Sequence, residues 1–177
     1  MANGFELKID LSDSAEDVAA LMAVTVDQVK KAAQRALVKT GQWLRTHSVR
    51  ELGQELGIVQ APLAKRFRVY PRHAEREVRF WVGLDPIGLH RLGSPRVTAK
   101  GVRVNRKEYE GGFISPMHSS QLTVYKRKGR ERLPIEMVTE DIEQQARAVI
   151  ERWERRVFDR FSEIFQQEAA AVLNGYA

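Results

Sequence analysis

The sequence predicts an α+β fold in which an N-terminal strand and helices and a long C-terminal helix flank a central antiparallel sheet of short strands. Apolar residues recur at helical spacing in most of residues 1–60 and in residues 134–177. Between them, apolar and polar residues alternate in short runs separated by glycine or proline, with no long helix in between, which is typical of an antiparallel sheet with basic loops. A chain of 177 residues is long enough for one domain with a substantial core, so we expect a single domain over residues 1–177.

The first element of the chain is a predicted strand. Apolar residues from Phe5 to Leu11 alternate with charged residues, which is the period of a half-buried strand. Ser14, followed three residues later by Asp17, resembles a capping box and predicts a short helix that ends near Met22.

Two further helices are predicted before residue 60. Capping signatures begin them at Thr25 and at Ser48, and the apolar residues between follow three-and-four spacing. We therefore expect the helical path to break near His47. The second helix should end at Leu56, because Gly57 is suited to a helix stop.

The central region, residues 61–133, is predicted to begin with a short helix and to continue as strands. Pro62 suits the first turn of that helix because its missing N–H group has no helical partner there. Gly101 offers a hairpin turn or a bulge in the second strand. The predicted strands cover residues 78–82, 97–105, 111–114 and 122–125.

The last element is predicted to be one long helix that begins at the N-cap candidate Thr139 and runs to about Val172. Its length of about 50 Å would be large for a domain of this size. Part of its apolar stripe could therefore meet a neighbouring subunit, or the whole stripe could be covered by its own domain. Four aromatic residues are the candidates for core or subunit packing, with the core preferred: Trp153, Phe158, Phe161 and Phe165.

The positive charge of the chain is concentrated in its middle. The net charge is +6, and residues 61–133 hold 17 Lys and Arg against 6 Asp and Glu, whereas both outer segments are mildly acidic. One face of the folded protein is therefore expected to attract phosphate or an acidic surface. The alternative is a solvated basic surface with no partner.

Basic residues gather at three places in this region. Lys65, Arg66 and Arg68 flank Phe67 near the predicted short helix. Two predicted hairpins carry the residues that we expect to contact a partner or DNA, namely Lys100, Arg103, Arg106 and Lys107 on one and Lys126, Arg127, Lys128 and Arg130 on the other. Few aromatic side chains lie between these basic residues, so any DNA contact should be made to the sugar–phosphate backbone and be independent of DNA sequence. The same loops could instead meet acidic faces of proteins, including another copy of this chain.

No pattern for catalysis or for metal binding is found. The chain has no cysteine and no HExxH, GxSxG or GxxxxGK[ST] motif, and its four histidines lack ligand spacing. We therefore expect no catalytic residue, no cofactor and no metal, and hence no enzyme. No run approaches the roughly 20 apolar residues of a membrane span, and the first residues do not open a signal peptide, so no membrane partner is expected. With no cysteine for disulfides, we expect an intracellular product, or one that never relied on oxidative folding.

Five segments of the central region, taken in order, resemble one protein family. They are Ile87-Gly-Leu-His-Arg-Leu-Gly93, Lys100-Gly-Val-Arg-Val104, Gly112-Phe-Ile114, Val124-Tyr-Lys-Arg-Lys-Gly129 and Arg132-Leu-Pro-Ile135. The order is similar to that of the minor tail protein Z family, the tail completion proteins of long-tailed bacteriophages. The N-terminal helices of that family are resembled by the upstream segments Ala33-Gln-Arg-Ala-Leu37, Leu44-Arg45, Glu51-Leu52 through Leu56-Gly-Ile58, and Arg66-Phe67. The resemblance covers roughly residues 26–142. The chain departs from the pattern at Gly112, where alanine is usual, and at residues 138–140, which replace a Gly-Pro-Ser-like stretch.

The resemblance implies a structural virion protein of the phage tail and neck that has no chemistry to perform. It would be made in the host cytoplasm and would complete the head-proximal end of the tail for joining to the head. A ring, most naturally a homohexamer, is implied, with the tail tube or tail terminator and the head-tail connector as partners and possible non-specific contact with DNA in the channel. The alternative from another class is a sequence-independent nucleic-acid-binding protein that works alone in the cell.

Overall fold

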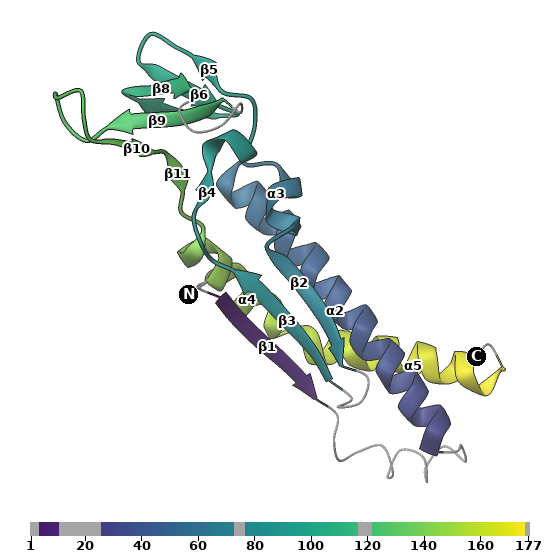
Figure 1. The fold of residues 1–177 in the computed structure, drawn as a ribbon. Coiled ribbons are helices and arrows are strands. Elements are labelled where there is room, and N and C mark those ends of the chain that lie inside the picture. The colour runs from purple at the N-terminus through teal and green to yellow at the C-terminus, as the bar shows by residue number, and fades with distance from the viewer. Residues whose placement is uncertain (1–3, 11–25, 73–76, 117–121, 176–177) are drawn as a thin grey trace.

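The computed structural model describes residues 4–10, 26–72, 77–116 and 122–175. The predicted helix over residues 14–22 lies outside these residues. The α+β class is confirmed, because helices and antiparallel sheets both contribute to the fold (Figure 1). The elements are β1 (Gly4–Asp10), α2 (Val26–Leu56), α3 (Gln60–Ala64), β2 (Phe67–Arg72), β3 (Glu77–Gly83), β4 (Ile87–Gly88), the 3-10 helix η1 (Leu89–Arg91), β5 (Arg96–Val97), β6 (Gly101–Val104), β7 (Lys107–Glu110), β8 (Gly112–Ser115), β9 (Thr123–Arg127), β10 (Ile135–Met137), β11 (Thr139–Glu140), α4 (Glu143–Glu154) and α5 (Val157–Leu173).

The long helix α2 is the centre of the molecule. It packs against β2 and β3 of an antiparallel sheet with the order β1-β3-β2, and also against α4 and α5 (Figure 1). The predicted N-terminal strand is confirmed as β1, which pairs with β3 from Gly4 opposite Gly83 to Asp10 opposite Glu77. Strand β2 was not predicted.

The predicted break near His47 is wrong, because α2 is continuous from Val26 to Leu56. Ser48 does not cap a helix; its side chain is fully buried inside α2, and its hydroxyl has no hydrogen-bond partner. Leu44 and Leu52, on either side of Ser48, lie in one buried cluster, and a bend between them would open that cluster. Tertiary packing therefore overrides the local capping signal.

The predicted stop at Gly57 is confirmed. Gly57 has a φ of 64°, in the left-handed region that glycine adopts readily. Its N–H group donates to the carbonyl of Gln54 at 3.2 Å, and the N–H group of Ile58 donates to the carbonyl of Gly53 at 3.0 Å. This is the pair of bonds of a Schellman motif, and it turns the chain directly into the short helix α3, close to the one predicted at Pro62.

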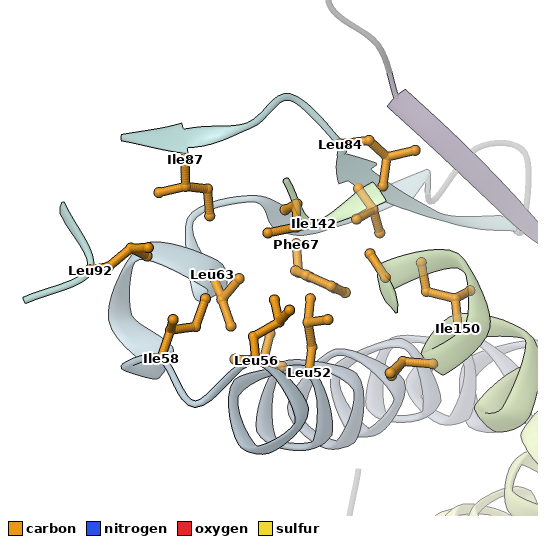
Figure 2. Packing of buried hydrophobic residues seen from close by; sticks show 14 of the residues in the cluster. Leu52, Leu56, Ile58, Leu63, Phe67, Leu84, Ile87, Leu92, Ile142 and Ile150 are labelled. Carbon is orange, nitrogen blue, oxygen red and sulfur yellow. The ribbon is translucent and has the colours of Figure 1, made fainter. Parts of the chain in front are cut away.

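The main core lies where the C-terminal half of α2, α3, the sheet and α4 meet (Figure 2). Phe67 of β2 and Phe80 of β3 are fully buried, with ring centroids 6.0 Å apart. Around them lie Leu52, Leu56, Leu63, Ile142 and Ile150. The core therefore draws residues from all three predicted segments of the chain.

The predicted C-terminal helix begins later than expected. Thr139 and Glu140 form the strand β11, which pairs with β4, so Thr139 is not the N-cap. The helix α4 begins at Glu143 instead, where the backbone N–H group is satisfied by Oδ1 of Asp141 at 3.0 Å. Pairing with another strand thus competes successfully with a local capping signal.

The single long helix was also a wrong prediction, because the chain turns between Glu154 and Val157 and separates α4 from α5. The N–H group of Arg156 donates to the carbonyl of Trp153 at 3.0 Å and tightens the end of α4. The turn lets α4 contribute to the main core, while Phe161 and Ile164 of α5 pack against the N-terminal half of α2. The two helices thereby cover different stretches of α2 (Figure 1).

Two small antiparallel sheets lie together at one end of the elongated molecule (Figure 1). Their strand orders are β5-β6-β7 and β10-β9-β8, and we call residues 96–137 the β-module. The predicted strands over residues 97–105, 111–114 and 122–125 correspond to β5 and β6, β8 and β9. Beneath the module, β4 and β11 pair over two residues each and connect it to the rest of the fold.

Candidate functional site

The β-module carries all eight of the basic residues predicted to contact a partner. The module as a whole holds ten Lys and Arg against four Asp and Glu. Seven of the eight predicted side chains are exposed, and Lys107 is half-buried. The cations from residues 100–107 lie on and around the β6–β7 hairpin, and those from 126–130 lie at the end of β9 and in the turn that follows.

Four of these eight cations already have partners within the chain. Arg103 faces Glu108 at 4.0 Å, and Lys128 faces Glu136 at 3.3 Å. The guanidinium of Arg127 lies 5.8 Å from the centre of the Phe113 ring. Lys107 is the fourth.

Lys107 forms an ion pair with Glu140 of β11, so its role is structural. The hydroxyl of Tyr109 donates to the second oxygen of the same carboxylate at 2.9 Å. Burial, together with this hydrogen bond and the negative charge of Glu140, raises the pKa of the Tyr109 hydroxyl above its ordinary value, so the phenol stays protonated. Lys107, Tyr109 and Glu140 together attach the β-module to the β4–β11 strand pair.

The other four cations are available to a partner. Lys100, Arg106, Lys126 and Arg130 are exposed and form no ion pair with any residue that the structure describes. The surface that sequence reasoning selected is therefore present, but three of its eight charges already face a carboxylate of the described chain.

A second basic surface surrounds α3. Two adjoining hollows, with volumes of about 530 and 560 Å³, meet at Lys65, and we call them together the α3 groove. Its cations come from α2, from the turn after α3, from β2 and from η1. They are Arg45, Lys65, Arg66, Arg68 and Arg91.

Arg45 is held in the groove by neutral groups. Its Nε–H donates to the carbonyl of Phe67 at 2.8 Å, and its Nη2 donates to the carbonyl of Ala64 at 2.9 Å. These carbonyls lie at the end of α3 and the start of β2, so Arg45 fixes the chain turn between them. Among the residues that the structure describes, no carboxylate pairs with Arg45, and part of its five-donor fork is left for a ligand.

Arg68 is also held without a carboxylate. Its guanidinium lies 5.9 Å from the centre of the Trp81 ring and is within 3.4 Å of the Tyr70 hydroxyl. Arg66 is the one groove cation with an acidic partner, Asp85 at 3.6 Å. The groove therefore presents five cations and one opposing carboxylate among the residues described.

Sequence reasoning found only part of this groove. Lys65, Arg66 and Arg68 are adjacent in the chain and were recognised as a cluster, whereas Arg45 and Arg91 are distant in sequence. Only the packing of α2, α3 and η1 brings the five together, so no local signal in the sequence could have found the other two.

The aromatic residues of the C-terminal helices have three different environments. Phe161 is 8% exposed and stacks on the half-buried Phe165, with ring centroids 5.9 Å apart, in agreement with a core role. Trp153 is half-buried and contacts Trp43, with ring centroids 5.3 Å apart. Phe158 is 77% exposed, so the preferred core role is wrong for this residue. It lies on the solvent side of α5, where the chain's own core cannot reach it.

His47 lies among these aromatic residues, with its ring centroid 4.5 Å from that of Trp153. Burial lowers the pKa of His47, and the charges of Arg50, Arg160 and Arg156 lower it further, against a smaller opposing effect from Glu51. The imidazole is therefore held in its neutral form.

No candidate metal site lies in the described part of the chain. Across residues 4–10, 26–72, 77–116 and 122–175, no group of three or more His, Asp or Glu side chains is placed to hold a metal ion. His73 and His118 lie outside the described residues. Among the described helices, none has the length and apolar character needed to cross a membrane.

Comparisons of the chain with known proteins add no relative: no family model, no curated protein and no solved structure matches it. The two basic surfaces, the β-module and the α3 groove, are therefore the features on which a function must be argued.

Proposed function

We propose that this chain is a structural protein of a phage tail and neck, which completes the head-proximal end of the tail and works as an oligomeric ring. The resemblance to tail completion proteins supports this role, and so do the basic and apolar surfaces that the fold exposes.

The observation that carries the proposal is the spatial grouping of the five segments on which the resemblance rests. Residues 100–104 include β6, residues 112–114 lie in β8, and residues 124–129 include most of β9. Strands β8 and β10 pair on either side of β9, and residues 132–135 lead into β10. Residues 87–93 form β4 and η1, whose buried side chains share one cluster with those of β6 and β9. The segments are thus neighbours in a single structural unit.

Exposed apolar side chains support association with other proteins. Leu122, Leu133 and Met137 of the β-module are 55%, 68% and 46% exposed, and Phe158 of α5 is 77% exposed. A subunit with apolar and basic surfaces at separate places suits head-to-tail contacts, which close into rings when the rotation between subunits allows it.

The test is binding to tail tubes. The purified chain should be incubated with isolated tail tubes that lack their completion protein, and its mass in solution should be measured by light scattering beforehand. Binding at one end of the tubes, by monomers or by a preformed ring, is expected. If the protein ignores the tubes at concentrations where it is folded and soluble, the proposal is wrong.

The second candidate function is that of a sequence-independent nucleic-acid-binding protein that works alone. The cations of the β-module that lack an internal partner favour it. This candidate predicts tight, salt-dependent binding to duplex DNA that is lost when the 126–130 cluster is neutralised, together with no affinity for tail tubes.

A further inference from the structure

We infer that the α3 groove is a binding site for the phosphate backbone of nucleic acid, and that it is separate from the basic loops of the β-module. The inference does not depend on the proposed virion role, because a ring around a DNA channel and a free DNA-binding protein could both use such a groove.

The groove is organised for an anion before any ligand arrives. Arg45 is fixed by two backbone carbonyls at 2.8 and 2.9 Å, and Arg68 lies against Trp81. Arginine side chains that are already held in place lose less conformational freedom on binding than mobile ones. Neither one pairs with a carboxylate in the described ranges, so an incoming anion would have no ion pair from these ranges to displace.

The remaining cations extend the charge along the groove. Lys65 lines both hollows, and Arg91 lines the hollow that Arg45 does not line. Both are exposed, and neither forms an ion pair within the described part of the chain. Only Arg66 is balanced, by Asp85 at 3.6 Å. Four positive charges from three chain segments therefore remain without a counter-charge.

This arrangement fits a repeating anion better than a single acidic side chain. One carboxylate could neutralise one guanidinium, whereas duplex DNA carries a negative charge about every 1.7 Å along its axis and can meet several cations at once. Apart from its cations, the groove is lined by small or apolar residues, with Gln42 and Tyr70 as the other polar side chains. Groups that could read bases are thus few, and binding should be independent of sequence.

The test compares three double variants of the full chain, each of which lowers the net charge by four. Lys65→Glu with Arg91→Glu changes the groove, and Lys126→Glu with Arg130→Glu changes the β-module. The matched control, Lys31→Glu with Arg155→Glu, changes two exposed cations of α2 and of the turn after α4, remote in sequence from both surfaces. All six residues are exposed, so the fold should be retained, and circular dichroism checks this. Binding is measured by fluorescence anisotropy with two labelled 20-bp duplexes of unrelated sequence, over a series of salt concentrations.

The groove variant is expected to bind both duplexes at least about tenfold more weakly than the control variant. Its plot of log affinity against log salt concentration should also be shallower by about 2, since two phosphate contacts are lost. An equal loss in the groove and control variants would mean that net charge alone matters, and the inference would be overturned. It would also be overturned if only the β-module variant lost affinity. The inference is likewise overturned if the wild type fails to bind DNA at low salt.

Discussion

Replacing Gly101 by alanine tests whether the β-module is an integral part of the fold. Gly101 begins β6 and has a φ of 157°, a conformation that residues with a side chain rarely adopt. A Cβ atom there would lie 2.2 Å from the carbonyl oxygen of Tyr109 and 2.9 Å from the nitrogen of Gly111. Both are backbone atoms of the opposing strand and its turn, so neither can move aside without opening the β6–β7 pairing.

The expected loss of free energy of unfolding has two parts, one from backbone conformation and one from steric clash, and substitutions at two other glycines separate them. Gly57 has a φ of 64° and open space around its Cβ position, so Gly57→Ala measures the cost of backbone conformation alone, about 1 kcal/mol. Gly129 also has open space and no positive φ, so Gly129→Ala should change the free energy of unfolding by less than about 0.5 kcal/mol. Gly101→Ala adds a steric clash of about 1–3 kcal/mol to the conformational cost and should lower the free energy of unfolding by about 2–4 kcal/mol.

Urea denaturation followed by tryptophan fluorescence measures all three variants. The tryptophans lie in α2, β3 and α4, outside the β-module, so they report whether damage to the module reaches the rest of the fold. It should, because Val102, Val104 and Val124 belong to the same buried cluster as Leu52 and Phe80. The reasoning is refuted if Gly101→Ala unfolds at the same urea concentration as Gly129→Ala.

Four other substitutions have expected outcomes. Phe161→Ala should lower the free energy of unfolding by about 3 kcal/mol because the Phe161 ring is buried. Phe158→Ser should change it by less than about 0.5 kcal/mol because the Phe158 ring is exposed. Urea denaturation of both variants checks this contrast. In light scattering, Phe158→Ser should also reduce self-association if the exposed ring contacts another subunit. Glu77→Ala removes a buried carboxylate that lies 2.7–3.7 Å from three cations, and it should lower the free energy of unfolding by about 2 kcal/mol. Equal stability of variant and wild type in urea denaturation would mean that these ion pairs contribute nothing. The pKa of His47 is held below its ordinary value of 6.5, so on acidification the unfolded chain takes up the proton before the folded chain does. The contribution of neutral His47 to the free energy of unfolding is complete above about pH 7 and is lost as the pH falls below about 6.5. His47→Gln should make this loss of stability smaller. Unfolding curves at pH 7.5 and 5.5 would show the same loss for variant and wild type if the imidazole were freely solvated.

The elements that were predicted correctly are those set by local patterns. The alternation after Phe5 led to β1, and the glycine-bounded runs after residue 96 led to β5, β6, β8 and β9, whereas β7 and β10 of the β-module were not predicted. Gly57 marked a helix end because a positive φ is required there, which depends on the residue itself. In each case the residue itself or its nearest neighbours in the sequence are enough to determine the local backbone conformation.

The errors arose where distant contacts compete with a local signal. Ser48 has the sequence of a helix cap, yet it lies within α2 because leucines on both sides of it belong to one core cluster. Thr139 resembles a cap too, but the pairing of β11 with β4 claims it. The turn at residues 155–156 contains neither glycine nor proline, so nothing in the local sequence marked it. The α3 groove was missed in part for the same reason, since Arg45 joins it only through the packing of α2 on α3.

The uninterrupted α2 helix also fixes a distance. Its 31 residues span about 46 Å at 1.5 Å per residue. Ala32 near its start packs against Ala169 and Val172 at the end of α5, while Leu56 at its other end belongs to the core beneath the α3 groove and the β-module. The helix therefore keeps two regions of the surface several nanometres apart, namely the end of α5 and the α3 groove with the β-module. A partner bound at the far end of α5 and another bound at the groove can be joined through this protein without touching each other.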